Sequence, residues 1–207
     1  MAVIRRAIFI FICLIFAHQP AAKAETLSPL ETLKGPFDQI VTILNDPAYQ
    51  SQAQKVNQRD KIWQVARPLF DFDEISRRTV GKDWDRFSEK EQVRFTDVFS
   101  EFLGHTYIDK IQGEYQNEKI VFISQLVRGP IALARTKLMR ESLEIPIDYR
   151  MKQADGLWKI YDVLVENGVS LVKNYRVQFK SILQKESPAK LIERLEKKLS
   201  SQQTPAT

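Results

Sequence analysis

Between residues 119 and 166, apolar and polar side chains alternate along the chain. The clearest run covers residues 143–152, where Leu143, Ile145, Ile147, Tyr149 and Met151 alternate with Glu144, Pro146, Asp148, Arg150 and Lys152. Successive side chains of a strand point to opposite faces of its sheet, so this period predicts a strand with one dry and one wet face.

Turn signals divide the same stretch into four segments. They lie at residues 128–130, 140–142 and 154–156, and the first and last of them contain glycine. The segments between them are each long enough for a strand, and they cover residues 119–127, 131–140, 143–153 and 157–166. Because short connections join neighbouring strands in antiparallel order, the stretch predicts a four-stranded antiparallel meander.

Helical periodicity flanks this predicted meander on both sides. Ser28 and Ser88 each stand three residues before a glutamate, which is the capping-box pattern of a helix start. Helices are expected from residue 28 to about 45, over 52–67, 71–80, 88–112 and 170–184, and from about 187 onward. This order predicts an α+β fold with helices packed on one face of a curved four-stranded antiparallel sheet.

The first 24 residues have the pattern of an export signal. Arg5 and Arg6 precede an apolar run, and Ala22-Lys23-Ala24 is a small-x-small cleavage site. The run is about 11 residues long, against the roughly 20 that a membrane span needs. We therefore expect a cleaved signal peptide at residues 1–24, a single domain at 25–200, and a disordered polar tail at 201–207.

Export limits the chemistry that is expected of the mature chain. The chain has 31 Lys and Arg against 26 Asp and Glu, and loss of Arg5, Arg6 and Lys23 leaves a net charge of only +2. A nucleic-acid-binding protein would carry a concentrated basic surface instead. The single cysteine, Cys13, lies in the signal, so disulfides and thiol chemistry are not expected.

Candidate catalytic residues are few, and a structural role explains each of them. His105 is the one histidine of the mature chain and has no cysteine or second histidine to join it at a metal. The pairs Asp71 with Asp73 and Asp83 with Asp85 lie beside turn and cap signals. Asp162, within an apolar strand, is expected to make a buried structural hydrogen bond. No catalytic or metal site is predicted.

The expected strands and helices have more inward-facing apolar and aromatic residues than polar residues suited to catalysis. Phe95, Phe99, Leu103 and Tyr107 form a broad stripe on the expected long helix, opposite the dry face of the sheet. One interpretation is an ordinary filled core. The other is a hollow core that holds an apolar ligand, and periodicity alone does not separate the two.

Three segments together resemble the MlaC family, also called the toluene-tolerance family. The first runs Leu69-Phe70-Asp71-Phe72-Asp73, with Gly81-Lys82-Asp83-Trp84 after it. The second is the aromatic stripe. The third runs Trp158-Lys159-Ile160-Tyr161-Asp162-Val163, followed by Gly168-Val169-Ser170-Leu171-Val172, Asn174-Tyr175-Arg176 and Gln178-Phe179. The likeness covers about residues 28–200. The chain departs from the family pattern at residues 166–170, which carry one extra residue.

The resemblance implies a periplasmic, non-enzymatic phospholipid carrier with a cystatin-like or nuclear-transport-factor-like body. It implies no cofactor, only bound phospholipid as cargo. Its implied partners are an inner-membrane ABC transporter bearing an MCE-domain protein and an outer-membrane lipoprotein complex. The protein is expected to be a monomer. Residues expected to line the lipid cavity are Phe99, Leu103, Tyr107, Ile145, Ile147, Tyr149, Met151, Val163 and Val165.

Two alternatives and one surface hypothesis remain open at this point. A small enzyme of similar fold would use Tyr149, Tyr161 and Asp162 around an apolar cone, and a ligand-free adaptor would have a filled core. The surface hypothesis concerns a basic stripe on the expected helix 170–184. Lys173, Arg176 and Lys180 share one helix face and are expected either to be solvated or to dock a partner.

Overall fold

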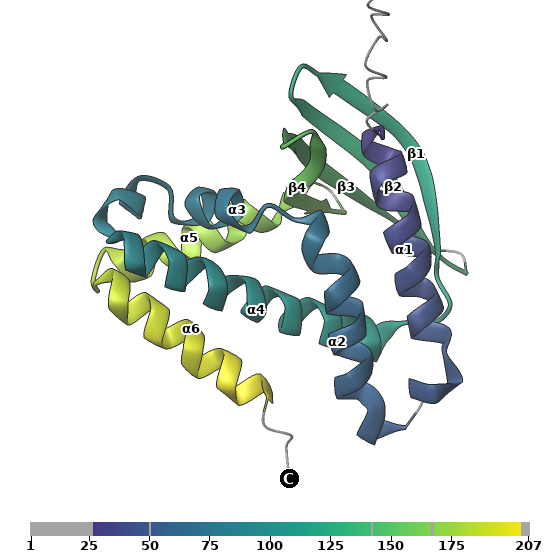
Figure 1. Cartoon of the computed structure of the whole chain (residues 1–207), viewed down its shortest axis with the longest axis horizontal. Helices are drawn as coiled ribbons and strands as arrows, with labels where there is room; N and C mark the ends of the chain where they lie inside the picture. Colours follow the sequence, from purple (N-terminus) through teal and green to yellow (C-terminus); the bar gives the residue numbers. More distant parts are fainter. Residues whose placement is uncertain (1–26, 50, 142, 167, 204–207) are drawn as a thin grey trace, which may run out of the picture.

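The computed structural model describes residues 27–203, apart from residues 50, 142 and 167. The expected signal peptide and its cleavage site lie outside the described residues. Within them, the fold is α+β, as predicted, with an antiparallel sheet beside six α-helices (Figure 1).

The four expected strands are present and pair in sequence order. They are β1 (Lys119–Arg128), β2 (Ile131–Arg140), β3 (Leu143–Ala154) and β4 (Leu157–Val165). The register puts Ile147 beside Thr136 and Val165, and Tyr149 beside Ala134 and Val163. Side chains of the dry face of β3 therefore meet small and apolar neighbours on both sides.

The prediction of four strands was wrong by one, because a short strand follows β4. β5 (Val169–Ser170) pairs with Leu164 and Val165 of β4. The turn between them has Glu166 at φ 52° and Gly168 at φ 81°, a left-handed conformation that glycine adopts at little cost. This turn folds the chain back on β4 before the next helix.

The N-terminal helices are α1 (Pro29–Asn45), α2 (Lys55–Ala66), α3 (Phe72–Val80) and α4 (Glu89–Glu114). Three of the four begin where the capping signals indicate, and α2, predicted from residue 52, begins at Lys55 after a short 3-10 turn at Gln52–Gln54. Both capping boxes form, since the side chains of Ser28 and Ser88 accept from the backbone N–H three residues on, and the glutamates reach back. Asp71 caps α3 in the same way, at 2.9 Å from the Glu74 N–H.

The C-terminal helices are α5 (Leu171–Leu183) and α6 (Pro188–Gln203). α6 includes residues 201–203. The predicted start of the disordered tail, at residue 201, is therefore too early. The physical reason is packing on α4: the Gln202 Nε2 donates to Thr106 Oγ1 at 2.9 Å. Residues 204–207 lie outside the described part.

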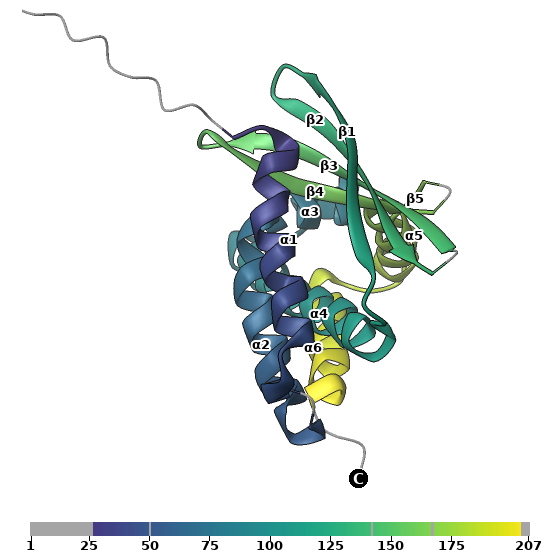
Figure 2. The same cartoon turned by 90° about the vertical axis from the view of Figure 1, so that its right-hand side faces the viewer.

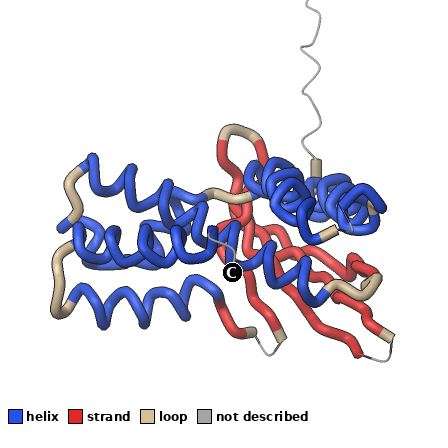
Figure 3. Tube along the Cα trace, turned by 90° about the horizontal axis from the view of Figure 1, so that it is seen from below, coloured by secondary structure: helices blue, strands red, loops and turns tan. Residues whose placement is uncertain are grey.

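Helices lie on both faces of the sheet, so the prediction that they pack on one face was wrong. α1 lies across the apolar face, with its Leu30 N–H donating to Gln125 of β1 at 2.9 Å (Figure 2). α3 and α5 reach β4 from the polar face, where Lys152 pairs with Asp71 at 3.1 Å and Glu74 at 3.2 Å. α4 and α6 lie side by side (Figure 1), and the helical part of the molecule extends to one side of the sheet (Figure 3).

Three apolar clusters fill this arrangement instead of one continuous core. A helical cluster joins α3, α4, α5 and α6 and includes Phe95, Phe99 and Phe179. A sheet cluster joins α1 to the dry face of β2, β3 and β4. A small third cluster of Leu44, Ile62 and Ile108 ties α1 and α2 to α4. The candidate site lies between the sheet cluster and the third cluster, whose residues Phe37 and Leu44 both line it.

Candidate functional site

An apolar pocket of about 260 Å³ lies between α1, the C-terminal half of α4 and the dry face of the sheet. We call it the sheet pocket. Its lining comes from α1, α4, β1, β2, β3 and the loop before β1, and consists of Phe37, Ile40, Val41, Leu44, Tyr107, Lys110, Ile111, Glu114, Tyr115, Glu118, Ile120, Thr136, Leu138, Arg140, Ile147 and Tyr149. Most of the exposed wall is carbon, as expected of a site for an apolar ligand.

The α1 wall is a single helical stripe. Phe37, Ile40, Val41 and Leu44 recur at intervals of three and four residues, so they share one face of the helix. These four residues were missing from the predicted lining. The signal was available, because their spacing predicts an inward face, but the sequence did not indicate that α1 covers the sheet.

The floor of the sheet pocket is held rigid by ring contacts and one hydrogen bond. The ring of Tyr149 meets that of Phe37 edge-on, with centroids 5.4 Å apart, and the Thr136 hydroxyl donates to the Ile147 carbonyl at 2.8 Å. Burial raises the pKa of the Tyr149 phenol above its ordinary value, so it stays protonated and neutral. The floor carries no net charge.

The rim is charged but balanced. Lys110 and Arg140 supply two positive charges, and Glu114 and Glu118 supply two negative ones. Arg140 forms an ion pair with Glu118, whose side chain is almost fully buried, and its Nη2 donates to the Glu114 carbonyl at 2.7 Å. Burial alone would raise the pKa of Glu118, but hydrogen bonds from Gln116 and Arg140 outweigh burial and lower it. This rim suits a ligand end without strong net charge.

Three of the nine residues predicted for the cavity line the sheet pocket, namely Tyr107, Ile147 and Tyr149. Phe99 and Leu103 lie instead in the helical cluster, where both are buried. Met151 is buried in the sheet cluster, and Val163 packs against it. Ile145 shares the β3 face of Ile147 without lining the pocket, and Val165 lies exposed at the turn into β5.

The residues of the enzymatic alternative do not converge on the pocket. Asp162 is buried on the opposite face, where it accepts from the Ser170 hydroxyl at 2.7 Å, the Val172 N–H at 3.1 Å and Arg150 at 3.1 Å. This is the structural hydrogen bonding that was expected of it. Tyr161 lies under the Arg78 guanidinium, 4.4 Å from its ring centroid.

His105 also lies away from the sheet pocket. Burial and the neighbouring Arg59 lower the pKa of its imidazole, so it is neutral at pH 7. Within residues 27–203, apart from the gaps, no group of three or more His, Cys, Asp or Glu side chains is placed to hold a metal ion. In the same described residues, no helix has the length and apolar character of a membrane span.

The basic stripe lies exposed along α5. Arg176 has a structural task, because its Nε donates to the Arg78 carbonyl at 2.6 Å. The backbone N–H of Lys173 donates to the Ser170 hydroxyl at 3.0 Å, and the residue itself is exposed. Docking by Lys173, Arg176 and Lys180 stays a prediction.

An α1 helix laid over a curved antiparallel sheet, with an apolar pocket between them and a balanced rim, defines a small-molecule-binding body. The chain matches the family model described as "MlaC protein" over residues 35–197, and it belongs to that family. It is also similar to a solved phospholipid-binding protein from Ralstonia solanacearum in complex with a phospholipid. The two share 20% identity and a TM-score of 0.70 over 84% of this chain and 97% of the other. A search of curated protein sequences finds no match.

Proposed function

We propose that this protein is a periplasmic carrier that binds phospholipid by its acyl chains in the sheet pocket. The observation that carries the proposal is the apolar pocket itself, found in a chain of the MlaC family. The phospholipid bound by the similar Ralstonia protein supports the same ligand class. Each methylene removed from water is worth about 0.8 kcal/mol, so lipid tails need such shelter to cross an aqueous gap.

The proposal extends to lipid shuttling, which the ligand class and the family support. The carrier would pass lipid between an outer-membrane lipoprotein complex and an inner-membrane ABC transporter with an MCE-domain protein, and so maintain the lipid asymmetry of the outer membrane. Such a carrier works without cofactor or catalysis, because it need only match the affinity of a bilayer to load and unload. The balanced rim of Lys110, Arg140, Glu114 and Glu118 fits loose contact with a headgroup.

The test is direct extraction. The full chain is expressed, the protein is purified from the periplasm, and bound lipid is released with organic solvent and identified by mass spectrometry. We expect phospholipid at close to one molecule per protein. Recovery of no lipid, from protein that is folded by circular dichroism and is also offered phospholipid vesicles, would support the ligand-free adaptor instead.

A further inference from the structure

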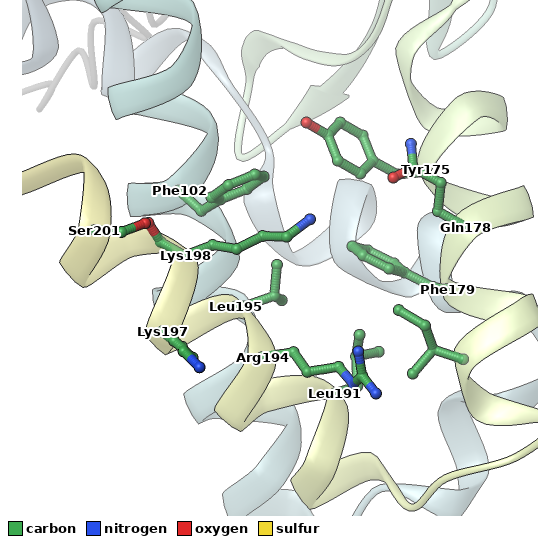
Figure 4. A pocket seen from close by; sticks show the side chains of 11 residues that line it. Phe102, Tyr175, Gln178, Phe179, Leu191, Arg194, Leu195, Lys197, Lys198 and Ser201 are labelled. Carbon is green, nitrogen blue, oxygen red and sulfur yellow. The ribbon is translucent and has the colours of Figure 1, made fainter.

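A second apolar pocket lies in the helical part of the molecule. It has a volume of about 390 Å³ and is enclosed by α4, α5 and α6. We call it the helix pocket. Phe102 of α4, Tyr175 and Phe179 of α5, and Leu195 of α6 point into it (Figure 4). The pocket shares no lining residue with the sheet pocket.

One pair of tyrosines separates the two pockets. Tyr107 of α4 lines the sheet pocket, Tyr175 of α5 lines the helix pocket, and the phenol groups of the two residues are neighbours. The Tyr175 ring is held in turn by Phe99 and Phe102, with centroids at 5.1 and 6.2 Å.

The sheet pocket is too small for the ligand that is proposed for it. Pockets that bury drug-sized molecules measure roughly 300–1,000 Å³, and the sheet pocket measures about 260 Å³. A phospholipid with two long chains exceeds that ligand size. Room for the chains must come either from widening between α1 and the sheet, or from the neighbouring helix pocket.

We propose that the helix pocket is a second acyl-chain compartment, which the distal end of a phospholipid tail enters from the sheet pocket between Tyr107 and Tyr175. This proposal rests on the proposed function, since the tail belongs to lipid in the sheet pocket. Its support is the apolar lining, the volume and the shared tyrosine boundary. The methylenes and terminal methyl of the tail are the chemical groups bound.

The basic residues at the outer rim of the helix pocket suit an alternative ligand, a separate fatty acid. Arg194 is paired with Glu186, but Lys197 and Lys198 have no ion pair within the described part of the chain. A separate fatty acid could place its carboxylate there and its chain inside. The experiment therefore has to establish which molecule supplies the chain that occupies the helix pocket.

Photo-crosslinking makes that distinction. The full-length protein is loaded with phosphatidylethanolamine that carries a diazirine either at the end of its palmitoyl chain or near the carbonyl. After irradiation, labelled peptides are identified by mass spectrometry. We expect the chain-end probe to label α5 and α6, and the carbonyl-end probe to label α1 and β3.

A variant pair adds an independent readout. Ile182 is partly buried and lines the helix pocket, so Ile182→Trp should fill it. Val177 lies on the same helix and is 71% exposed, so Val177→Trp is the matched control. In Ile182→Trp we expect the ratio of palmitoyl-lipid to decanoyl-lipid loading to fall at least tenfold, with labelling of α1 retained. The control should match the wild type.

The outcomes separate the two proposals. Chain-end labels confined to α1 and the sheet, with an unchanged loading ratio in Ile182→Trp, would overturn the second compartment and leave the carrier function standing. Labels on α5 and α6 from diazirine palmitate alone would likewise overturn it, in favour of a separate fatty-acid site. Failure to load any phospholipid would contradict the carrier function and the compartment together.

Discussion

The ion cluster around Glu74 is the polar contact that most clearly ties the helices to the sheet, and its loss should be measurable. Glu74 of α3 is 5% exposed and pairs with Arg77, with Arg78 and, at 3.2 Å, with Lys152 of β3. Burial by itself would raise the pKa of this carboxyl. The three cations outweigh burial and lower the pKa from 4.5 to about 2.

The sign and size of the effect follow from that pKa. A carboxyl whose pKa is lower in the folded state stabilises the fold fully above its unfolded pKa, and this contribution is lost as the pH falls toward the folded pKa. The drop from 4.5 to about 2 corresponds to about 3 kcal/mol at pH 7. About 1 kcal/mol of this should already be gone near pH 3.5.

The substitution Glu74→Gln removes the charge and keeps the shape. Lys152 retains Asp71 as a partner, and Arg77 and Arg78 are largely solvated, so we expect a loss of about 2–3 kcal/mol at pH 7. Urea unfolding followed by circular dichroism, with linear extrapolation, measures it. The control Glu193→Gln breaks an exposed pair with Lys190 and should cost less than about 0.5 kcal/mol.

The pH dependence decides whether the reasoning is right. The difference in unfolding free energy between wild type and Glu74→Gln should shrink steadily between pH 5 and pH 3, because the wild-type carboxyl becomes protonated in the unfolded state. A difference that is the same at pH 3 and pH 7 would show that packing, and not the charge of Glu74, holds α3 to the sheet.

Three further outcomes are expected. Ile147→Trp should fill the sheet pocket, abolish lipid loading and leave the melting temperature nearly unchanged. Leu103→Trp overpacks a filled core and should lower the free energy of unfolding by about 1–3 kcal/mol. The reverse pattern would contradict the pocket assignment. Lys173→Glu with Lys180→Glu should slow lipid hand-over to transporter-bearing vesicles at low salt, where screening is weakest, and equal transfer rates would rule out docking there. Phospholipids with matched tails should load to similar extents, so a headgroup preference above about 100-fold, or about 2.7 kcal/mol, would contradict a loose rim.

Local signals predicted most of the elements, because their causes are local. The caps at Ser28, Asp71 and Ser88 form as expected, and the alternation in 143–152 gave the dry face of β3. β5 was missed since it has two residues and exists only through its pairing with β4. No periodic pattern can be read in so short a segment.

The site was less predictable than the elements, and α4 shows why. Phe99, Leu103 and Tyr107 follow one another at four-residue intervals and share a face of the helix. The first two end in a filled cluster and the third in a pocket wall. Periodicity determines which face of a helix turns inward, but whether atoms or space lie opposite that face depends on elements elsewhere in the chain.

The division of the core offers a physical reason why space persists between its parts. An apolar cavity in a continuous core loses packing contacts and tends to collapse. Here the ring network of Phe95, Phe99 and Phe179 fills the helical cluster, and the buried residues Met151 and Ile160 lie in the sheet cluster, so each is packed without the other. The ion pairs of Lys152 and the bonds of Asp162 keep the two at fixed positions across β4. The sheet pocket takes Phe37 and Tyr149 from the sheet cluster and no residue from the helical cluster, so an open pocket leaves the packing of the helical cluster intact and is compatible with a stable fold.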